Sequence, residues 1–150
     1  MTPATAHTTP RGGTASMTIK SRTEKLALVR EFVSDAARRF GFDEEAINKI
    51  ALAVDEACTN VIKHSYKFAT DQDITISVSS DDSAFEIVIR DHGKAFDPDA
   101  VKQPDMKEYL SQYRRGGLGM YLMRSLMDRV EYHALPGPKN EVRMVKVLTK

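Results

Sequence analysis

The sequence predicts an α+β domain, a two-layer sandwich in which three main helices cover one face of a mainly antiparallel sheet. Residues 21–40 and 43–62 carry apolar side chains at helical spacing, and a third helical segment begins near Gly117. Two pairs of segments alternate apolar and polar residues around short turns, which is typical of β-hairpins. Adjacent hairpins favour an antiparallel sheet whose apolar face is covered by the helices.

The composition limits the function classes. The chain has 150 residues, 41% of them hydrophobic, which is enough for one domain with a core. A formal net charge of +1 argues against a broad basic surface, so we expect no direct nucleic-acid contact. No apolar run reaches the ~20 residues that a membrane helix needs, and no signal-peptide stretch opens the chain. With a single cysteine, the expectation is a cytoplasmic protein without a membrane partner.

The first part of the chain divides into a tail, a short strand and a helix. Residues 1–16 are rich in Thr, Ala, Gly and Pro and are predicted to be a disordered tail before the domain of residues 17–150. Residues 17–20 form a short strand in this prediction, and Ser21 with Glu24 fits a capping box for the first helix. That helix would bury Leu26, Val29, Val33, Ala36, Ala37 and Phe40, and end at Gly41.

The second helix has the strongest periodicity, and Asp43 is a suitable N-cap for it. Its apolar stripe is Ile47, Ile50, Ala51, Val54, Cys58, Val61 and Ile62, which we expect to pack on the sheet. Residues 74–78 and 85–89 are predicted to form the first hairpin, and residues 130–135 and 142–148 the second, with a turn over 136–140. The long loop over residues 92–115 indicates a functional segment.

Three groups of polar residues interrupt this pattern. On the second helix, Glu56 and Asn60 lie about opposite the apolar stripe. Such a face is often only solvated, but an amide oxygen is also a hard ligand suited to Mg²⁺, and a nearby carboxylate can deprotonate a hydroxyl.

The second group follows an apolar strand, where Asp91 and Gly93 are compatible with an ordinary turn. A carboxylate at that position can instead accept a hydrogen bond from the amine of adenine and repel the O6 atom of guanine, while Gly93 lets a base approach the backbone. The third group is Arg114-Arg115-Gly116-Gly117-Leu118-Gly119 at the start of a helix. It fits either a flexible linker or an anion site built from freed N–H groups and guanidiniums.

Taken in order, the three groups resemble the ATPase superfamily of gyrase, the large heat-shock chaperone, histidine kinases and mismatch-repair ATPases, whose fold is the Bergerat fold. Three segments are similar to motifs of the bacterial anti-sigma-factor serine/threonine kinases of the stress-response and sporulation type. They are DEACTNVIKH, DHGKAFDP and RGGLGMYLMRSLMD. Ala95 replaces the second glycine of the superfamily's D-x-G-x-G, a departure that resembles this branch. The resemblance covers about residues 17–148.

The resemblance implies a role for each matching residue. Glu56 matches the catalytic base, Asn60 the Mg²⁺ ligand, and Asp91 with Gly93 the adenine site. The residues that would contact the phosphates of ATP are Arg115, Gly116, Gly117, Leu118 and Gly119. Residues 94–115 would form the lid over the nucleotide.

The implied function is an ATP- and Mg²⁺-dependent serine/threonine kinase that sequesters a sigma factor and phosphorylates an anti-sigma antagonist protein, in the form of a homodimer. Two alternatives stay open. One is an ATP-gated binding module without phosphoryl transfer, which keeps every nucleotide contact and differs only in the use of Glu56. The other is a detached histidine-kinase catalytic domain, which is disfavoured because no helical hairpin with a phospho-acceptor histidine occurs.

Overall fold

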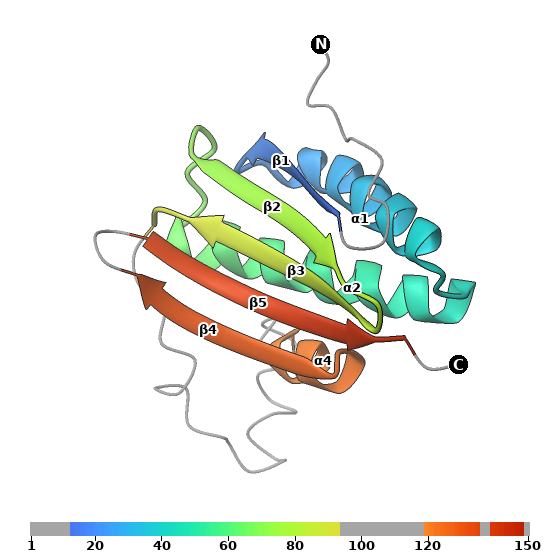
Figure 1. Ribbon diagram of the computed structural model, residues 1–150. Helices are drawn as coiled ribbons and strands as arrows, with labels where there is room; N and C mark the ends of the chain where they lie inside the picture. Colours follow the sequence, from blue (N-terminus) through green and yellow to red (C-terminus); the bar gives the residue numbers. More distant parts are fainter. Residues whose placement is uncertain (1–12, 94–118, 136–138, 149–150) are drawn as a thin grey trace.

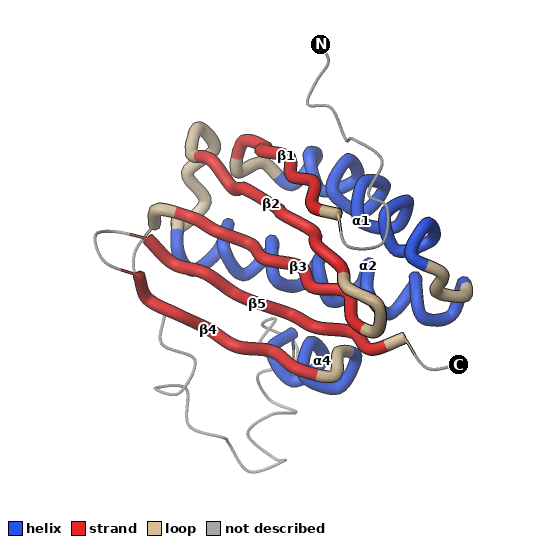
Figure 2. Tube along the Cα trace, viewed as in Figure 1, coloured by secondary structure: helices blue, strands red, loops and turns tan. Residues whose placement is uncertain are grey.

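A computed structural model of the chain describes residues 13–93, 119–135 and 139–148. Its five strands form one sheet in the order β1-β2-β3-β5-β4, and every neighbouring pair is antiparallel. The helices α1, α2 and α4 lie on one side of that sheet (Figures 1 and 2). The predicted α+β sandwich is therefore confirmed. In chain order the elements are β1 Thr14–Lys20, α1 Leu26–Phe40, α2 Glu44–Asn60, β2 Asp73–Ser80, β3 Ala84–Asp91, α4 Gly119–Leu126, β4 Arg129–Leu135 and β5 Lys139–Val147.

The first strand is longer than its composition suggests. β1 begins at Thr14 and pairs with β2 from there, so the boundary predicted between tail and domain, after residue 16, is wrong by three residues. Ala15 faces the helices and is only 6% exposed. Small residues extend the strand over positions 14–16 because the edge of β2 offers them backbone hydrogen bonds, which composition does not reveal. Residues 1–12 of the predicted tail lie outside the described residues.

The predicted capping box is also wrong. The Ser21 hydroxyl donates a hydrogen bond to the Ala69 carbonyl oxygen at 2.6 Å and accepts one from the Gln72 N–H at 3.2 Å. A 3₁₀ turn over Thr23–Lys25 precedes α1, and no side chain caps either element. Ser21 therefore links the end of β1 to the segment before β2 by hydrogen bonds. A buried hydroxyl must form hydrogen bonds, and in this fold the groups near it belong to that segment.

The core lies between the helices and the sheet, as the periodicity predicts. The six positions predicted for α1 are all buried, together with Phe32. In α2 the predicted Ala51 is only half-buried, whereas Ala53 and Ala57 are buried. This difference arises because α2 packs against both α1 and α4, so its buried face is wider than one stripe.

One end of the sandwich is closed by three aromatic rings. Phe40 of α1, Phe42 and Phe85 of β3 contact one another, with ring centroids 5.3 to 5.9 Å apart. Gly41 ends α1 with φ 119°, a left-handed conformation that favours glycine. Asp43 then caps α2 by accepting the Ala46 N–H at 2.9 Å, as predicted. The aromatic cluster and the cap fix the position of the N-terminus of α2. They therefore also fix where the C-terminal end of α2 meets the sheet.

The face of the sheet opposite the helices is polar. Glu141 of β5 is paired there with Arg90 of β3 at 2.8 Å and with Arg143 at 2.6 Å, and its side chain is 4% exposed. Burial alone raises the pKa of the Glu141 carboxyl, but the hydrogen bonds from the two guanidiniums outweigh it and leave the pKa below its ordinary value. None of the described helices is long and apolar enough to cross a membrane.

Candidate active site

Glu56 and Asn60 lie one turn apart near the C-terminal end of α2, as the sequence predicts. Glu56 is half-buried. Burial raises the pKa of its carboxyl, the neighbouring Asp55 carboxylate raises it further, and Lys63 opposes both. The carboxyl group therefore holds a proton more readily than an exposed glutamate does, which suits a group that accepts a proton from a hydroxyl.

Asn60 is buried, with 8% of its surface exposed. Within the described ranges, its Nδ2 atom makes no hydrogen bond of ordinary geometry, although the amide lies close enough to the Tyr132 hydroxyl to lower the pKa of that group. A buried amide without a partner is costly, and such a group indicates a ligand that completes its contacts. The oxygen of the same amide is the type of donor that Mg²⁺ prefers, so the residue fits the metal role that the resemblance implies.

Tyr132 of β4 lies beside Asn60 and was not singled out by the sequence. Burial raises the pKa of the Tyr132 hydroxyl to about 12, while Arg124 and the Asn60 amide lower it by smaller amounts. The hydroxyl also lies 3.9 Å from the Met123 sulfur of α4. Tyr132 therefore links the end of α2 to α4 in its neutral form at physiological pH.

A π-helix over Val61–Ser65, labelled η2, continues α2 directly. It is followed by Lys67 and Phe68 at φ 49° and 67°, a left-handed turn made without glycine. Tyr66 begins this turn, and its hydroxyl donates to the Asp73 carbonyl oxygen at 2.5 Å and accepts the His92 N–H at 2.8 Å. The end of α2 is thus tied to the segment that follows β3, by a residue that no sequence pattern indicated.

Asp91 is the last residue of β3 and is 3% exposed. Its Oδ1 atom accepts hydrogen bonds from the Gly93 N–H at 2.8 Å and from the Asn140 amide at 3.0 Å. Asn140, predicted to lie in the turn over 136–140, belongs to β5 and pairs with Asp91 in the sheet. In Figure 1 the end of β3, the start of β5 and the C-terminal end of α2 meet at the left edge of the sandwich.

Gly93 is needed for a different reason than the sequence suggests. A Cβ atom on Gly93 would overlap the backbone carbonyl of Ser65 in η2, at 2.6 Å from its carbon and even closer to its oxygen. The space beside this glycine is therefore occupied by the π-helix. Close approach of two backbones, one of the known uses of glycine, explains the residue without a base stacked on it.

The remaining predicted site residues are only partly described. Gly119 is the first residue of α4, whereas Arg115, Gly116, Gly117 and Leu118 lie outside the described residues, as does the segment 94–115 predicted as a lid. The structure therefore brings together the end of α2 with Asn60, and the end of β3 with Asp91 and Gly93. In the described part of the chain, no three His, Cys, Asp or Glu side chains form a metal site of their own.

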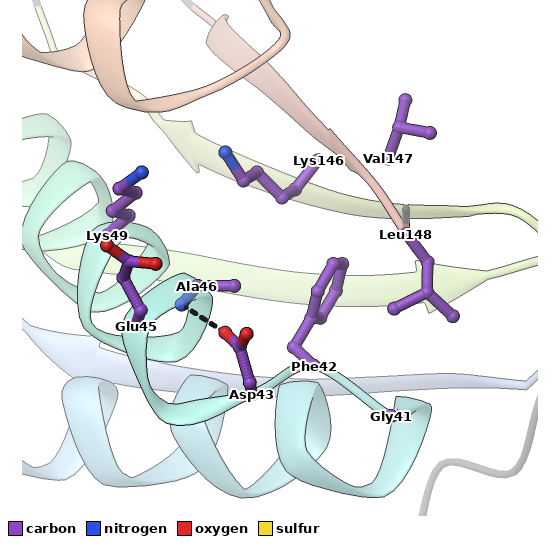
Figure 3. Close-up of a pocket in the computed structure, with 9 residues that line it drawn as sticks. All are labelled: Gly41, Phe42, Asp43, Glu45, Ala46, Lys49, Lys146, Val147 and Leu148. Atoms are coloured by element: carbon purple, nitrogen blue, oxygen red, sulfur yellow. Dashed lines mark hydrogen bonds between the residues drawn. The ribbon is translucent and has the colours of Figure 1, made fainter. Parts of the chain in front are cut away.

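A hollow of about 240 Å³ lies at the opposite end of α2. Its lining comes from the α1–α2 turn, the first turns of α2 and the end of β5 (Figure 3). Lys146, on its rim, donates a hydrogen bond to the Leu126 carbonyl oxygen at 2.9 Å. This hollow is separate from the predicted nucleotide site, because Asn60 is at the other end of the same helix.

Comparison with known proteins decides the family. Residues 19–146 match the histidine kinase-like ATPase domain. The chain belongs to this family. Its curated relatives include Serine-protein kinase RsbW of Bacillus subtilis, 34% identical over 125 residues, which are 79% of this chain and 78% of that protein. The same kinase of Bacillus pumilus is 36% identical over 141 residues, covering 89% of this chain and 85% of the relative.

A third relative, Serine-protein kinase RsbW of Halalkalibacterium halodurans, is 35% identical over 122 residues, which are 79% of this chain and 74% of the relative. The chain is thus a member of the family of serine-protein kinases, and the predicted family and enzyme class are confirmed. A crystal structure of the RsbU and RsbW domains of a Mycobacterium tuberculosis protein superposes with a TM-score of 0.61 at 13% identity. The superposed region covers 89% of this chain and 32% of the Mycobacterium tuberculosis chain, and at this identity the similarity shows the fold alone.

Proposed function

We propose that the chain binds Mg²⁺-ATP where α2 and β3 end, and transfers the γ-phosphoryl group to a serine or threonine of a small antagonist protein. The relatives named serine-protein kinases support the reaction class. The single observation that carries the reaction at this site is the half-buried Glu56 carboxyl, with a raised pKa, one turn from the buried Asn60 amide. In this proposal the carboxyl would accept the proton and the amide oxygen beside it would hold Mg²⁺.

Each residue would have a defined task. Asp91 accepts a hydrogen bond from the 6-amino group of adenine, and Asn60 holds Mg²⁺, which neutralises charge on the phosphates. The hydroxyl oxygen of the substrate forms a bond to the γ-phosphorus as the bond to the β–γ bridging oxygen breaks, and ADP leaves. The hydroxyl proton passes to Glu56. Residues 115–119 would contact the phosphates, as the resemblance implies.

The biological setting follows from the same resemblance. Unphosphorylated antagonist would compete with a sigma factor for this protein, and phosphorylation would release the antagonist, so the chain acts on transcription as an anti-sigma factor. We further propose that it works in the cytoplasm as a homodimer.

The nucleotide part of the proposal is tested by Asp91→Asn. The Gly93 N–H and the Asn140 amide hold the Oδ1 position, so the amide oxygen of the variant stays there and its NH₂ group faces the adenine amine. The hydrogen bond to adenine is then lost, which corresponds to about 1 kcal/mol or more. Titration calorimetry with Mg²⁺-ATP should therefore show affinity reduced about fivefold or more, while circular dichroism shows an unchanged fold. If ATP affinity stays the same in a folded variant, the adenine role of Asp91 is wrong.

A further inference from the structure

We propose that Asn140 is a positioning residue that orients the Asp91 carboxylate and thereby sets the preference of the site for adenine. This inference rests on the proposed role of Asp91 in nucleotide binding and names the residue that makes that role selective. Sequence patterns placed Asn140 in a turn, and its position on β5 opposite Asp91 appears only in the sheet register.

Among the described residues, the hydrogen bonds to the Asp91 side chain all go to one of its two oxygens. Oδ1 accepts the Gly93 N–H at 2.8 Å and the Asn140 Nδ2–H at 3.0 Å, and no residue that the structure describes donates to Oδ2. A carboxylate with one hydrogen-bond donor can still rotate about that hydrogen bond. Two donors from separate segments on the same oxygen fix the plane of the carboxylate. Oδ2 is therefore the oxygen left to accept a hydrogen bond from a ligand.

Asn140 fixes the following loop as well. The same Nδ2 atom donates to the Gly93 carbonyl oxygen at 3.0 Å. Both atoms that face the amide are acceptors, so the nitrogen and not the oxygen of the amide must point towards them. One amide group thus holds both the carboxylate and the backbone two residues later in a single arrangement.

An uncharged donor suits this task better than a charged one. A lysine or arginine at the same place would form an ion pair with Asp91, and an arginine would engage both carboxylate oxygens. The neutral amide holds one oxygen and leaves the negative charge available to the ligand. The ligand that such an oxygen selects is a purine with an exocyclic amine at position 6, because the O6 of guanine is an acceptor and is repelled.

The test compares ATP with purine riboside triphosphate, which lacks the 6-amino group, by titration calorimetry in the presence of Mg²⁺. A hydrogen bond to a charged group corresponds to about a tenfold or larger preference, so the wild-type protein should bind ATP at least ~10-fold more tightly. Asn140→Leu keeps the volume of the side chain and removes the donor. Asn140→Ala is the second variant, in case leucine prevents folding. Asn48→Leu makes the same change at an exposed position of α2.

We expect Asn140→Leu and Asn140→Ala to reduce the preference for ATP to about threefold or less, with the affinity for the analogue changed little. Asn48→Leu should keep the wild-type ratio. A merely structural role would lower the unfolding temperature without changing the ratio of the two affinities. If folded Asn140 variants keep the wild-type ratio, the inference is wrong while the proposed function stands. If the wild-type protein itself binds both nucleotides equally, the adenine role of Asp91 fails and this inference with it.

Discussion

At the scale of single residues, Glu56 faces two opposing requirements. Its half-burial disfavours the charged carboxylate, which lowers the stability of the folded chain at neutral pH, and the same burial makes it a better proton acceptor. Because the pKa is raised above its ordinary value of 4.5, this cost is absent at acidic pH and grows as the pH rises through the raised pKa. Function and stability therefore favour different side chains at this position.

Glu56→Gln should separate the two effects. Phosphoryl transfer should fall by ~10²- to 10⁴-fold through loss of the base, while Mg²⁺-ATP binding remains. The unfolding temperature at pH 7 should rise, by at most about 3 °C because the group is still partly solvated, and this difference should shrink towards pH 4. Glu31→Gln, at an exposed position of α1, serves as the matched control and should change neither quantity. Equal transfer rates in the wild type and in Glu56→Gln would show that Glu56 is not the base.

Residue types predicted part of the site and missed the rest for a physical reason. Glu56, Asn60 and Asp91 were found because a polar residue on an amphipathic helix, or at the end of a buried strand, is visible in one segment of sequence. Tyr66 and Asn140 act through partners 26 and 49 residues away, so their roles depend on how elements meet. Ser21 does not cap a helix for the same reason, because its hydroxyl bonds to Ala69 and Gln72, which are distant in the sequence.

At the scale of elements, the contact between η2 and the loop after β3 decides how the two halves of the site approach each other. Gly93 permits that contact because its missing Cβ leaves room for the Ser65 carbonyl. The Tyr66 hydroxyl stabilises the same junction through its hydrogen bonds to the Asp73 carbonyl oxygen and the His92 N–H. The separation between the ends of α2 and β3 is therefore set by backbone contacts, which side-chain patterns in the sequence do not report.

Gly93→Ala should disturb this junction. Something must shift to admit the Cβ, and overpacking of this kind costs about 1 to 3 kcal/mol. Both the unfolding temperature and the affinity for ATP should fall. Gly41→Ala is the control, since it strains a left-handed helix cap at the far end of the fold, and it should lower the unfolding temperature only. An ATP affinity that is unchanged in Gly93→Ala would show that the junction does not shape the nucleotide site.

The β3–β5 pair carries a charge network whose strength should depend on pH. Glu141 has a lowered pKa, so its stabilising contribution is fully present above the ordinary value of 4.5 and is lost as the pH falls through the lowered value. Glu141→Gln should lower stability at pH 7 by about 1 to 2 kcal/mol, since its partners are partly exposed, and by less in strong acid. Urea unfolding at pH 7 and pH 3 measures this difference. A loss that is equal at both pH values would mean that the charge of Glu141 is not what stabilises the pair.

At the scale of the whole molecule, periodicity predicted the layers better than the boundaries. The apolar stripes of α1 and α2 and the alternation in β2 and β3 require two faces that cover each other, which is why the sandwich could be predicted. Sheet order, the early start of β1 and the wide buried face of α2 follow from packing between elements, which no single segment encodes. The predicted phosphate segment stays a prediction, because only its last residue, Gly119, lies within the described residues.

The most direct test of the central claim is phosphoryl transfer from ATP to a protein partner. Partners captured from native cells with the wild-type chain would be incubated with Mg²⁺ and γ-labelled ATP, and the modified residues identified by mass spectrometry. We expect one small partner to gain phosphate on serine or threonine and then leave the complex. With Glu56→Gln in place of the wild type, transfer should be ~100-fold or more slower. A wild-type chain that binds ATP and its partners but labels none of them would contradict the assignment as a protein kinase.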